Sequence, residues 1–214
     1  SNIGFLGTGP ASYMNVQELE ARGTKVHIIK GYGDTAVAEH SIALMWAAAR
    51  DLARMDREVR RGTWTPHGGM QLTGKTLGII GLGGIGREVA RMGAGLGMKV
   101  IGWNRTRHPE IKVPLVELDD LLAQSDVVSM NLTLGDETRG FLSRERVAKM
   151  KKGAIFVNTA RGALADEAAL IDALKSGHIR HAGLDVYTQE PLPADHPFTT
   201  MENVTLAAHA AFRT

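Results

Sequence analysis

The glycine pattern that follows an apolar run at residues 76–80 constrains the fold of this chain more than any other feature. The run is short and rich in β-branched residues, which is typical of a buried strand. Small and apolar residues then recur at helical spacing over residues 85–96, and a second apolar run follows at residues 99–102. Together these segments predict a strand–helix–strand unit.

Between the first run and the helical segment, Gly81, Gly83 and Gly86 form the pattern G-x-G-x-x-G. The first glycine permits a tight turn, the second lets a pyrophosphate approach the backbone, and the third lets the helix pack closely on the strand. The free N–H groups and the dipole at the start of the helix then hold the anion. A chain with 25 glycines can carry this pattern by chance, but its place between a strand and a helix predicts a dinucleotide-binding site.

The residues after the second apolar run bear on which dinucleotide binds. Folds that bind NAD commonly place an acid roughly 20 residues beyond the loop, where it accepts from the ribose 2′-hydroxyl. Here that place holds Asn104, and Arg105, Thr106 and Arg107 follow it. An acid would repel a 2′-phosphate, whereas an amide, a hydroxyl and two guanidinium groups would bind it. We expect NADP(H) to be preferred, with NAD(H) as the second option; the alternative is that these are solvated loop cations.

The composition excludes several classes of site and partner. The chain has 214 residues and a net charge of only +2, which does not imply a nucleic-acid or membrane partner. It contains no cysteine, which excludes disulfides, thiolate metal sites and cysteine nucleophiles, and we predict no metal site. No apolar run approaches the roughly 18 residues of a membrane-spanning helix, and no export leader is recognisable. We therefore expect a cytoplasmic protein.

Strand and helix patterns alternate along the rest of the chain. Apolar runs typical of strands lie at residues 127–130, 154–157, 181–186 and 204–207, and helical patterns lie at residues 116–124, 143–150 and 167–176. This alternation predicts an α/β fold of the Rossmann type, with a doubly wound parallel sheet. In such sheets ligands bind at the carboxyl ends of the strands.

Before the dinucleotide unit, the sequence predicts two short strands and a long helix. We expect strands at residues 3–6 and 25–29, a turn at residues 7–10, and a short helix capped by Asn15. A hinge at residues 31–33 leads to a helix from Asp34 or Thr35 to about Arg61. That helix is apolar over so much of its circumference that more than one surface must cover it. We predict a homodimer, with packing on both sides within one chain as the alternative.

Three polar residues follow successive predicted strands: Arg161, Glu190 and His209. The arginine could bind a substrate carboxylate in fork geometry and polarise the neighbouring carbonyl. The histidine could give a proton to a new alkoxide, and the glutamate could orient the imidazole and favour its protonated form. Each residue alone is more often structural, but their placement at neighbouring strand ends indicates a catalytic site.

The ordered motifs GYGDTAVAEHSIAL, GKTLGIIGLGGIG, NTARG and GLDVYTQEP, followed by His209, resemble the D-isomer-specific 2-hydroxyacid dehydrogenases over essentially the whole chain. This family includes glyoxylate/hydroxypyruvate reductases. The resemblance implies reversible NAD(P)-dependent reduction of a 2-keto acid to a D-2-hydroxy acid, with Arg161, Glu190 and His209 as the catalytic residues. It also implies cofactor contacts at Gly84, Ile85, Asn104, Leu132, Thr133, Thr159, Ala160 and Asp185.

The sequence departs from the family pattern in ways that matter for function. Ala211 stands where the family normally has a glycine. Residues 1–33 resemble the C-terminal remnant of a flavodoxin-like substrate domain, and residues 34–214 resemble the NAD(P)-binding domain. We expect flanking sequence to be missing at both ends, so that the other wall of the cleft is absent. The chain alone should then have weak or no turnover.

Two further functions remain open on the same scaffold. Transcriptional corepressors that resemble these dehydrogenases would use the dinucleotide site for sensing, and such relatives can keep all three polar residues. Oxidation of phosphite or formate is a weaker option, because the extra polar groups that formate needs are not evident. For the dehydrogenase, the expected partners are a small 2-keto or 2-hydroxy acid and a second copy of the chain.

Overall fold

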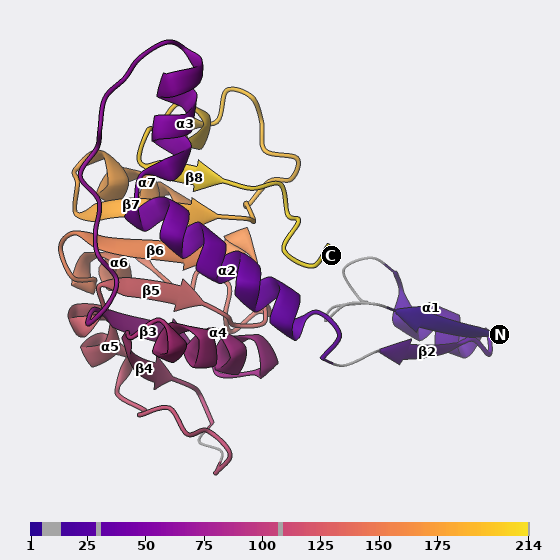
Figure 1. Cartoon of the computed structure of the whole chain (residues 1–214). Coiled ribbons are helices and arrows are strands. Elements are labelled where there is room, and N and C mark those ends of the chain that lie inside the picture. Colours follow the sequence, from indigo (N-terminus) through magenta and orange to yellow (C-terminus); the bar gives the residue numbers. More distant parts are fainter. Residues whose placement is uncertain (6–13, 29–30, 107–108, 214) are drawn as a thin grey trace.

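A computed structural model describes residues 1–5, 14–28, 31–106 and 109–213 of the chain. Its centre is a six-stranded sheet in the order β4-β3-β5-β6-β7-β8, in which every pair of neighbours is parallel (Figure 1). The strands are β3 (Thr76–Ile80), β4 (Lys99–Trp103), β5 (Val127–Met130), β6 (Ala154–Asn158), β7 (Ile179–Leu184) and β8 (Val204–Leu206). The chain moves from β3 outward to β4 and then crosses to β5 on the other side of β3, which confirms the doubly wound topology.

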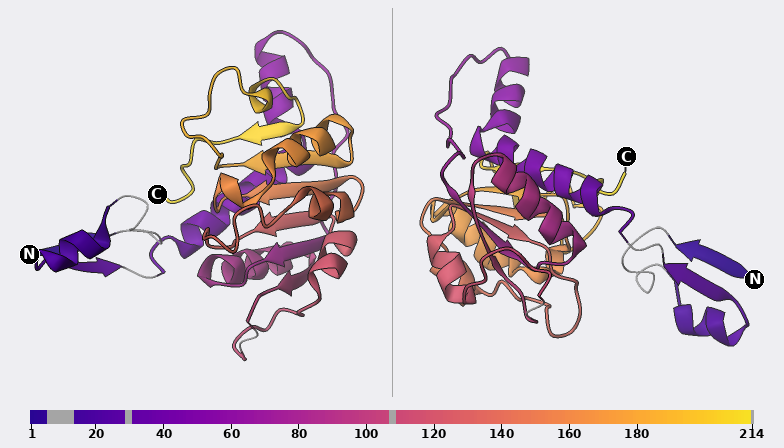
Figure 2. Two further views of the ribbon diagram at one scale, coloured as in Figure 1. Left: turned by 180° about the vertical axis from the view of Figure 1, so that it is seen from behind. Right: turned by 60° about the horizontal axis from the view of Figure 1, so that its bottom comes forward.

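Helices cover both faces of the sheet. One face carries α2 (Asp34–Ala49) and α4 (Gly84–Gly95), and the other carries α5 (Leu118–Gln124), α6 (Arg144–Lys149) and α7 (Glu167–Lys175) (Figures 1 and 2). Neighbouring residues of the central strands therefore enter different cores. Val127 and Ile155 pack with the α2 and α4 side, whereas Val128 and Phe156 pack with the α5 to α7 side. Burial on both faces explains why these strands are continuous apolar runs.

The predicted long helix over residues 35–61 is wrong in one respect, because the structure breaks it into α2 and α3 (Leu52–Arg60). Asp51 between them has a left-handed backbone with φ of 52°. The start also differs, since Gly33 is the N-cap and neither Asp34 nor Thr35 supplies a side-chain cap. Within the chain, α2 packs on α4 and on β6, β7 and β8. This packing covers most of its apolar face.

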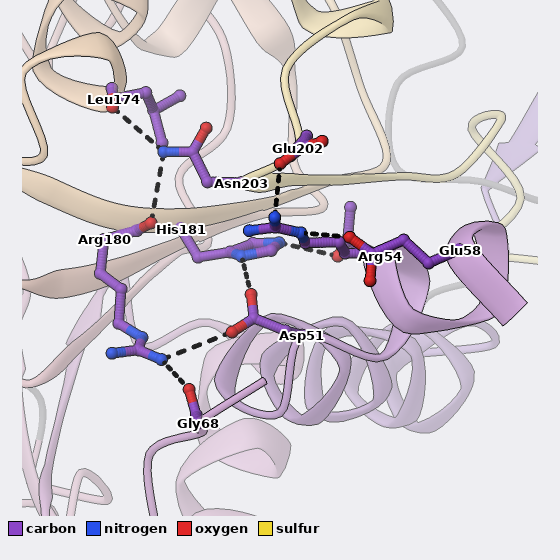
Figure 3. A network of polar contacts seen from close by, with 10 residues as sticks. Asp51, Arg54, Glu58, Gly68, Leu174, Arg180, His181, Glu202 and Asn203 are labelled. Carbon is purple, nitrogen blue, oxygen red and sulfur yellow. Dashed lines mark hydrogen bonds and ion pairs between the residues drawn. The ribbon is translucent and has the colours of Figure 1, made fainter. Parts of the chain in front are cut away.

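Contacts with β7 hold the break in place (Figure 3). The carboxylate of Asp51 lies 3.1 Å from Nδ1 of His181 and 3.4 Å from Nη2 of Arg180. Nε2 of His181 contacts the hydroxyl of Thr205 on β8 at 2.9 Å. Burial lowers the pKa of the His181 imidazole to about 4 despite the neighbouring Asp51 charge. The neutral ring therefore donates from Nδ1 to Asp51 and accepts at Nε2 from Thr205.

A separate two-stranded unit precedes α2 and lies beside its N-terminal end (Figures 1 and 2). It consists of β1 (Asn2–Phe5), α1 (Val16–Ala21) and β2 (Lys25–Ile28), with the two strands parallel. The predicted cap is confirmed, since Asn15 Oδ1 accepts from the Glu18 N–H at 3.1 Å. No residue of this unit whose burial is described is fully buried. The predicted turn at residues 7–10 and the strand ends at Leu6 and Ile29 lie outside the described residues.

The remaining predicted elements differ from the structure only at their ends. Strand β7 begins at Ile179 and ends at Leu184, before the predicted end at residue 186, and the Asp185 N–H makes one more bond to the end of β6, at the Asn158 carbonyl. Two short 3₁₀ turns, η2 (Gly162–Leu164) and η3 (Pro197–Thr199), follow β6 and β7. Among the described helices, none has the length and apolar character needed to cross a membrane.

Candidate active site

The carboxyl ends of all six parallel strands meet at one edge of the sheet, and the predicted site residues lie in the loops that leave this edge (Figure 1). The glycine loop leaves β3 at the point where the strand order reverses. Gly81 has a φ of +93°, and a Cβ there would lie 2.8 Å from the Asn131 carbonyl oxygen. At Gly86 a Cβ would collide with the Gly81 carbonyl, so helix α4 packs directly on the turn. The predicted roles of the first and third glycines are confirmed.

The middle of the glycine loop is open to a ligand. Gly83 is the N-cap of α4, and a Cβ there would meet no atom within 4 Å. No side chain caps the first N–H groups of α4, so these donors are suited to an anion. Gly84 is more confined, because the Asp34 carboxylate lies against it where any side chain would point. Ile85 is half-buried against the core on the α2 and α4 side.

The residues predicted to face the ribose lie at the carboxyl end of β4. A cavity of about 150 Å³ is lined there by Trp103, Asn104, Arg105, Leu115, Val116 and Glu117. Asn104 Oδ1 accepts from the Leu82 N–H at 2.9 Å, and its Nδ2 donates to the Thr106 carbonyl at 2.6 Å. Arg105 is exposed and pairs with Glu137 at 2.6 Å. Arg107 lies outside the described residues.

The next two loops supply the other predicted cofactor contacts. Leu132 after β5 is half-buried, and the neighbouring Thr133 is exposed. Thr159 after β6 is buried, and its hydroxyl lies 2.7 Å from the hydroxyl of Ser41 on α2. The Ala160 N–H donates to Asn158 Oδ1 at 3.0 Å, which fixes the start of this loop. These residues line the same edge as the glycine loop.

Arg161 is half-buried at the start of the η2 turn. Its backbone is extended, and its carbonyl accepts from Asn158 Nδ2 at 2.9 Å. Its Nη1 donates to the Ala160 carbonyl at 2.6 Å, and no carboxylate pairs with it among the described residues. The following Gly162 packs so closely on the Tyr187–Thr188 peptide that a Cβ would clash. The loop of Arg161 therefore adjoins the loop that carries Glu190.

Glu190 and His209 form the predicted pair. Glu190 Oε2 lies 2.6 Å from His209 Nδ1, and Glu190 Oε1 accepts from the Tyr187 N–H at 2.9 Å. Both side chains are partly exposed, so the pair is open to a ligand. A carboxylate on Nδ1 makes that nitrogen a donor and leaves Nε2 for proton exchange. The arrangement can orient a general acid–base histidine.

The hydroxyl of Tyr187 connects the starts of the loops that carry Glu190 and His209. It donates to the carbonyls of Leu184 at 3.1 Å and Ala207 at 2.6 Å, at the ends of β7 and β8. Burial raises the pKa of this hydroxyl to about 12, and the Asp185 charge acts in the same direction. Tyr187 therefore remains a hydrogen-bond donor at neutral pH.

Asp185, predicted as a cofactor contact, is fully buried. Its Oδ1 and Oδ2 accept from the N–H groups of Ala210 at 2.9 Å and Ala211 at 3.0 Å. Its backbone carbonyl accepts from the His209 N–H at 2.8 Å. In the described structure the side chain holds the histidine loop and has no surface for a ligand.

Sequence reasoning missed several residues of this site. His40 and Ser41 on α2 contact Asp185 and Thr159, and residues 115–117 form one wall of the cavity beside Asn104. His40 and Ser41 are polar residues on a face of α2 that otherwise packs into the core. Polar residues at these positions of the apolar pattern could have indicated a role in the site. In the described parts of the chain, no group of three or more acidic or histidine side chains could hold a metal ion.

Known proteins resemble this chain in sequence over most of its length. Residues 42–211 match the family described as D-isomer specific 2-hydroxyacid dehydrogenase, NAD binding domain. A glyoxylate reductase of Aeropyrum pernix is 45% identical over 84% of this chain and 57% of its own length. A hydroxypyruvate reductase of Thermotoga maritima is 40% identical over 92% of this chain and 66% of its own.

Solved structures agree as well. An acyclic imino acid reductase in complex with NADPH and D-Arg superposes with a TM-score of 0.85 at 33% identity, over 94% of this chain and 66% of its own. The chain spans 41 to 63% of the length of the first curated relatives that it matches.

Proposed function

Because this chain belongs to the D-isomer-specific 2-hydroxyacid dehydrogenase family, we propose that it is the cofactor-binding part of an oxidoreductase that interconverts a 2-keto acid and a D-2-hydroxy acid. Glyoxylate and hydroxypyruvate are the substrates we propose first, since they are named for relatives of 45% and 40% identity. The observation that carries the proposal is the 2.6 Å contact between Glu190 and His209 at the sheet edge that also bears the open glycine loop.

The residues at the edge fit a nicotinamide dinucleotide. The uncapped N–H groups at the start of α4 suit its pyrophosphate, and the cavity beside Asn104 suits the adenosine ribose. The bound cofactor supplies the hydride that reduces the keto carbon. Leu132, Thr133, Thr159 and Ala160 are proposed to line the path between the ribose and the reacting end.

The chain's own side chains are assigned three roles. Arg161 binds the substrate carboxylate through guanidinium N–H groups that no acid of the described structure occupies. His209 gives a proton from Nε2 to the oxygen of the new alkoxide, or removes it in the reverse reaction. Glu190 keeps the ring oriented through Nδ1 and stabilises the imidazolium.

We propose NADP(H) as the preferred cofactor and NAD(H) as the second. The support is the absence of an acid at residue 104 and the presence of Arg105 in the wall of the cavity. Glu137 holds Arg105 at the surface, so the guanidinium must leave this exposed pair to bind a 2′-phosphate. An exposed ion pair contributes only about 0–1 kcal/mol. Replacement of Glu137 by a 2′-phosphate as the partner of Arg105 therefore costs little free energy.

We propose that residues 1–33 belong to a substrate domain and residues 34–214 to the NAD(P)-binding domain. Support comes from the two-stranded unit, in which no side chain of described burial is fully buried. A two-stranded sheet of this kind is marginal by itself. The substrate domain would supply the second wall of the cleft, so the 214-residue chain alone should have weak or no turnover.

We also propose a homodimer. Intramolecular packing covers the buried residues of α2 but leaves Ile42, Ala43 and Trp46 at least partly accessible. Leu52 and Val59 of α3 and the nearby Trp64 are exposed, with Trp64 at 86%. A second copy of the chain is the partner that would cover this apolar surface. A cytoplasmic location stays a prediction.

A panel of 2-keto acids with NADPH and NADH tests the proposed function. The assay uses a protein that joins this chain to a complete substrate domain. We expect oxidation of NADPH with glyoxylate or hydroxypyruvate, and a roughly 10²–10⁴-fold lower kcat for His209→Gln with unchanged NADPH binding. The variant Arg144→Ala, which breaks a surface ion pair with Asp172, should behave like the wild type. Tight NADPH binding without consumption of any keto acid would instead favour the sensing function of a corepressor-like protein.

A further inference from the structure

The carboxylate of Asp185 is the centre of the hydrogen bonds that hold the histidine loop. It is fully buried, and both of its oxygens accept backbone N–H groups, from Ala210 and Ala211. The carbonyl of the same residue accepts the His209 N–H at 2.8 Å. One aspartate therefore binds three successive residues of the loop. A buried negative charge of this kind needs more compensation than two neutral donors usually give.

His40 on α2 is placed to provide that compensation. Its Nε2 lies 3.3 Å from Asp185 Oδ1. This nitrogen is buried and has no hydrogen bond of good geometry in the described structure. A proton on Nε2 would let the ring donate to this carboxylate oxygen, whereas a lone pair there would repel it. Helix α2 packs on β7, the strand that directly precedes Asp185, and this packing brings the two groups together (Figure 1).

The loop requires this support because its backbone is strained. His209 has a left-handed backbone with φ of 49°, a conformation that residues other than glycine rarely adopt. In this conformation its ring nitrogen meets Glu190 at 2.6 Å. If the Asp185 carboxylate lost its anchor and rotated, the N–H groups of Ala210 and Ala211 would lose their acceptors. The backbone of His209 could then relax and withdraw its ring from Glu190.

We infer that His40 is a positioning residue that holds the Glu190–His209 pair in register through the buried carboxylate of Asp185. The inference rests on the proposed function of His209. In the described structure His40 makes no hydrogen bond or ion pair with Arg161, Glu190 or His209, and it acts only through Asp185. It couples helix α2, which begins directly after the predicted hinge at residues 31–33, to the loop that carries the acid–base residue.

Three variants of the 214-residue chain test this role. His40→Leu removes the polar atom and keeps an apolar side chain in the space. His40→Gln keeps an N–H donor that can point at Asp185. His178→Leu is the matched control, because the His178 side chain hydrogen-bonds only to the Val147 carbonyl in the described structure and lies away from the site.

Amide hydrogen exchange by NMR is the first readout. We expect the Ala210 and Ala211 amides to exchange roughly tenfold faster in His40→Leu, as loss of a charge-assisted contact allows. Exchange of the Ile80 and Phe156 amides in the central strands should be unchanged. His40→Gln should restore protection, and His178→Leu should match the wild type.

The ring signals of His209 are the second readout. The proton shared between Nδ1 and Glu190 should be visible in the wild type and in His40→Gln and absent in His40→Leu. In an Asp185→Asn background, His40→Leu should add no further change, because the charge that His40 serves is gone. Should His40→Leu fail to fold, His40→Asn replaces it, since that amide is too short to reach Asp185.

The opposite ordering would overturn the inference. If His40 merely fills space, His40→Leu will protect the loop at least as well as His40→Gln, and the effect will persist in Asp185→Asn. Neither readout needs cofactor or turnover. Failure of the chain to bind NADPH would therefore contradict the proposed function, whereas the role of His40 would still be decided by these two readouts.

Discussion

The glycines of the phosphate loop are required for different reasons, and each reason belongs to a single residue. Gly86 has no room for a Cβ because the Gly81 carbonyl occupies that space, whereas Gly83 faces an open region. The spacing of the motif predicted both roles, because turn, approach and packing follow from the backbone alone. It could not predict that the Asp34 carboxylate would lie against Gly84, since that contact joins the motif to a helix from another part of the chain.

Replacement of the two glycines by alanine should separate folding from binding. Gly83→Ala should leave the free energy of unfolding nearly unchanged and weaken NADPH binding, because the methyl group enters only the ligand's space. Gly86→Ala should cost about 1–3 kcal/mol or more of stability, since the methyl group overpacks the helix–turn contact. Denaturant unfolding and a fluorescence titration with NADPH measure the two effects. Equal losses of stability in both variants would contradict these roles.

The cofactor preference also rests on single residues. Asn104→Asp combined with Arg105→Ala should move the preference towards NADH, because a carboxylate repels the 2′-phosphate and the guanidinium is gone. The new carboxylate can still accept from the Leu82 N–H, but it loses the bond that Nδ2 donates to the Thr106 carbonyl, so the residues that follow must move away from it. The ratio of the NADPH and NADH dissociation constants is the measurement, with Arg144→Ala as the control. An unchanged ratio would mean that these residues do not contact the phosphate.

At the scale of the element, the break between α2 and α3 illustrates what local pattern cannot supply. Apolar residues continue at helical spacing through Leu52 and Val59, so the sequence predicts one helix. The left-handed backbone of Asp51 depends on Arg180 and His181, which lie about 130 positions further along the chain. The strands, in contrast, were predictable because burial on both faces demands unbroken apolar runs.

This junction makes stability depend on pH. The pKa of His181 falls from 6.5 in the unfolded chain to about 4 in the folded protein, chiefly through burial. The unfolded state therefore takes up a proton below pH 6.5 that the folded state excludes until about pH 4. The stability that the neutral ring contributes is complete above pH 6.5. About 3 kcal/mol of it should be lost across that window.

His181→Gln should remove this dependence. The difference in free energy of unfolding between wild type and variant should shrink as pH falls from 6.5 to 4, because only the wild type loses the contribution of His181. Denaturant unfolding at a series of pH values measures it, with His27→Gln on the exposed face of β2 as the control. A difference that stays constant with pH would show that folding does not shift the pKa of His181.

At the scale of the whole molecule, the sheet, its topology and the edge that carries the site follow from the order of strands and helices. The catalytic candidates were recognisable because Arg161, Glu190 and His209 follow neighbouring strands. His40 and the burial of Asp185 were not, because they depend on how α2 crosses the sheet. The domain boundary and the dimer remain proposals.

The proposed dimer can be tested at the exposed apolar surface formed by Leu52, Val59 and Trp64. Trp64→Glu should shift the chain towards monomer in light scattering, because a charge would enter the proposed interface. Phe212→Glu, at another exposed aromatic on the sheet edge, is the matched control and should leave the mass unchanged. A wild-type chain that is monomeric at all concentrations would contradict the proposed dimer.

In the proposed reaction a hydride passes to a 2-keto acid held between Arg161 and His209. It can be followed with NADPH that carries deuterium at both C4 positions and hydroxypyruvate, using a protein that joins this chain to a complete substrate domain, with mass spectrometry and chiral analysis of the product. We expect one deuterium on C2 of D-glycerate, and none above background with His209→Gln although NADPH still binds. Product of the opposite configuration, or glycerate without the label, would contradict it.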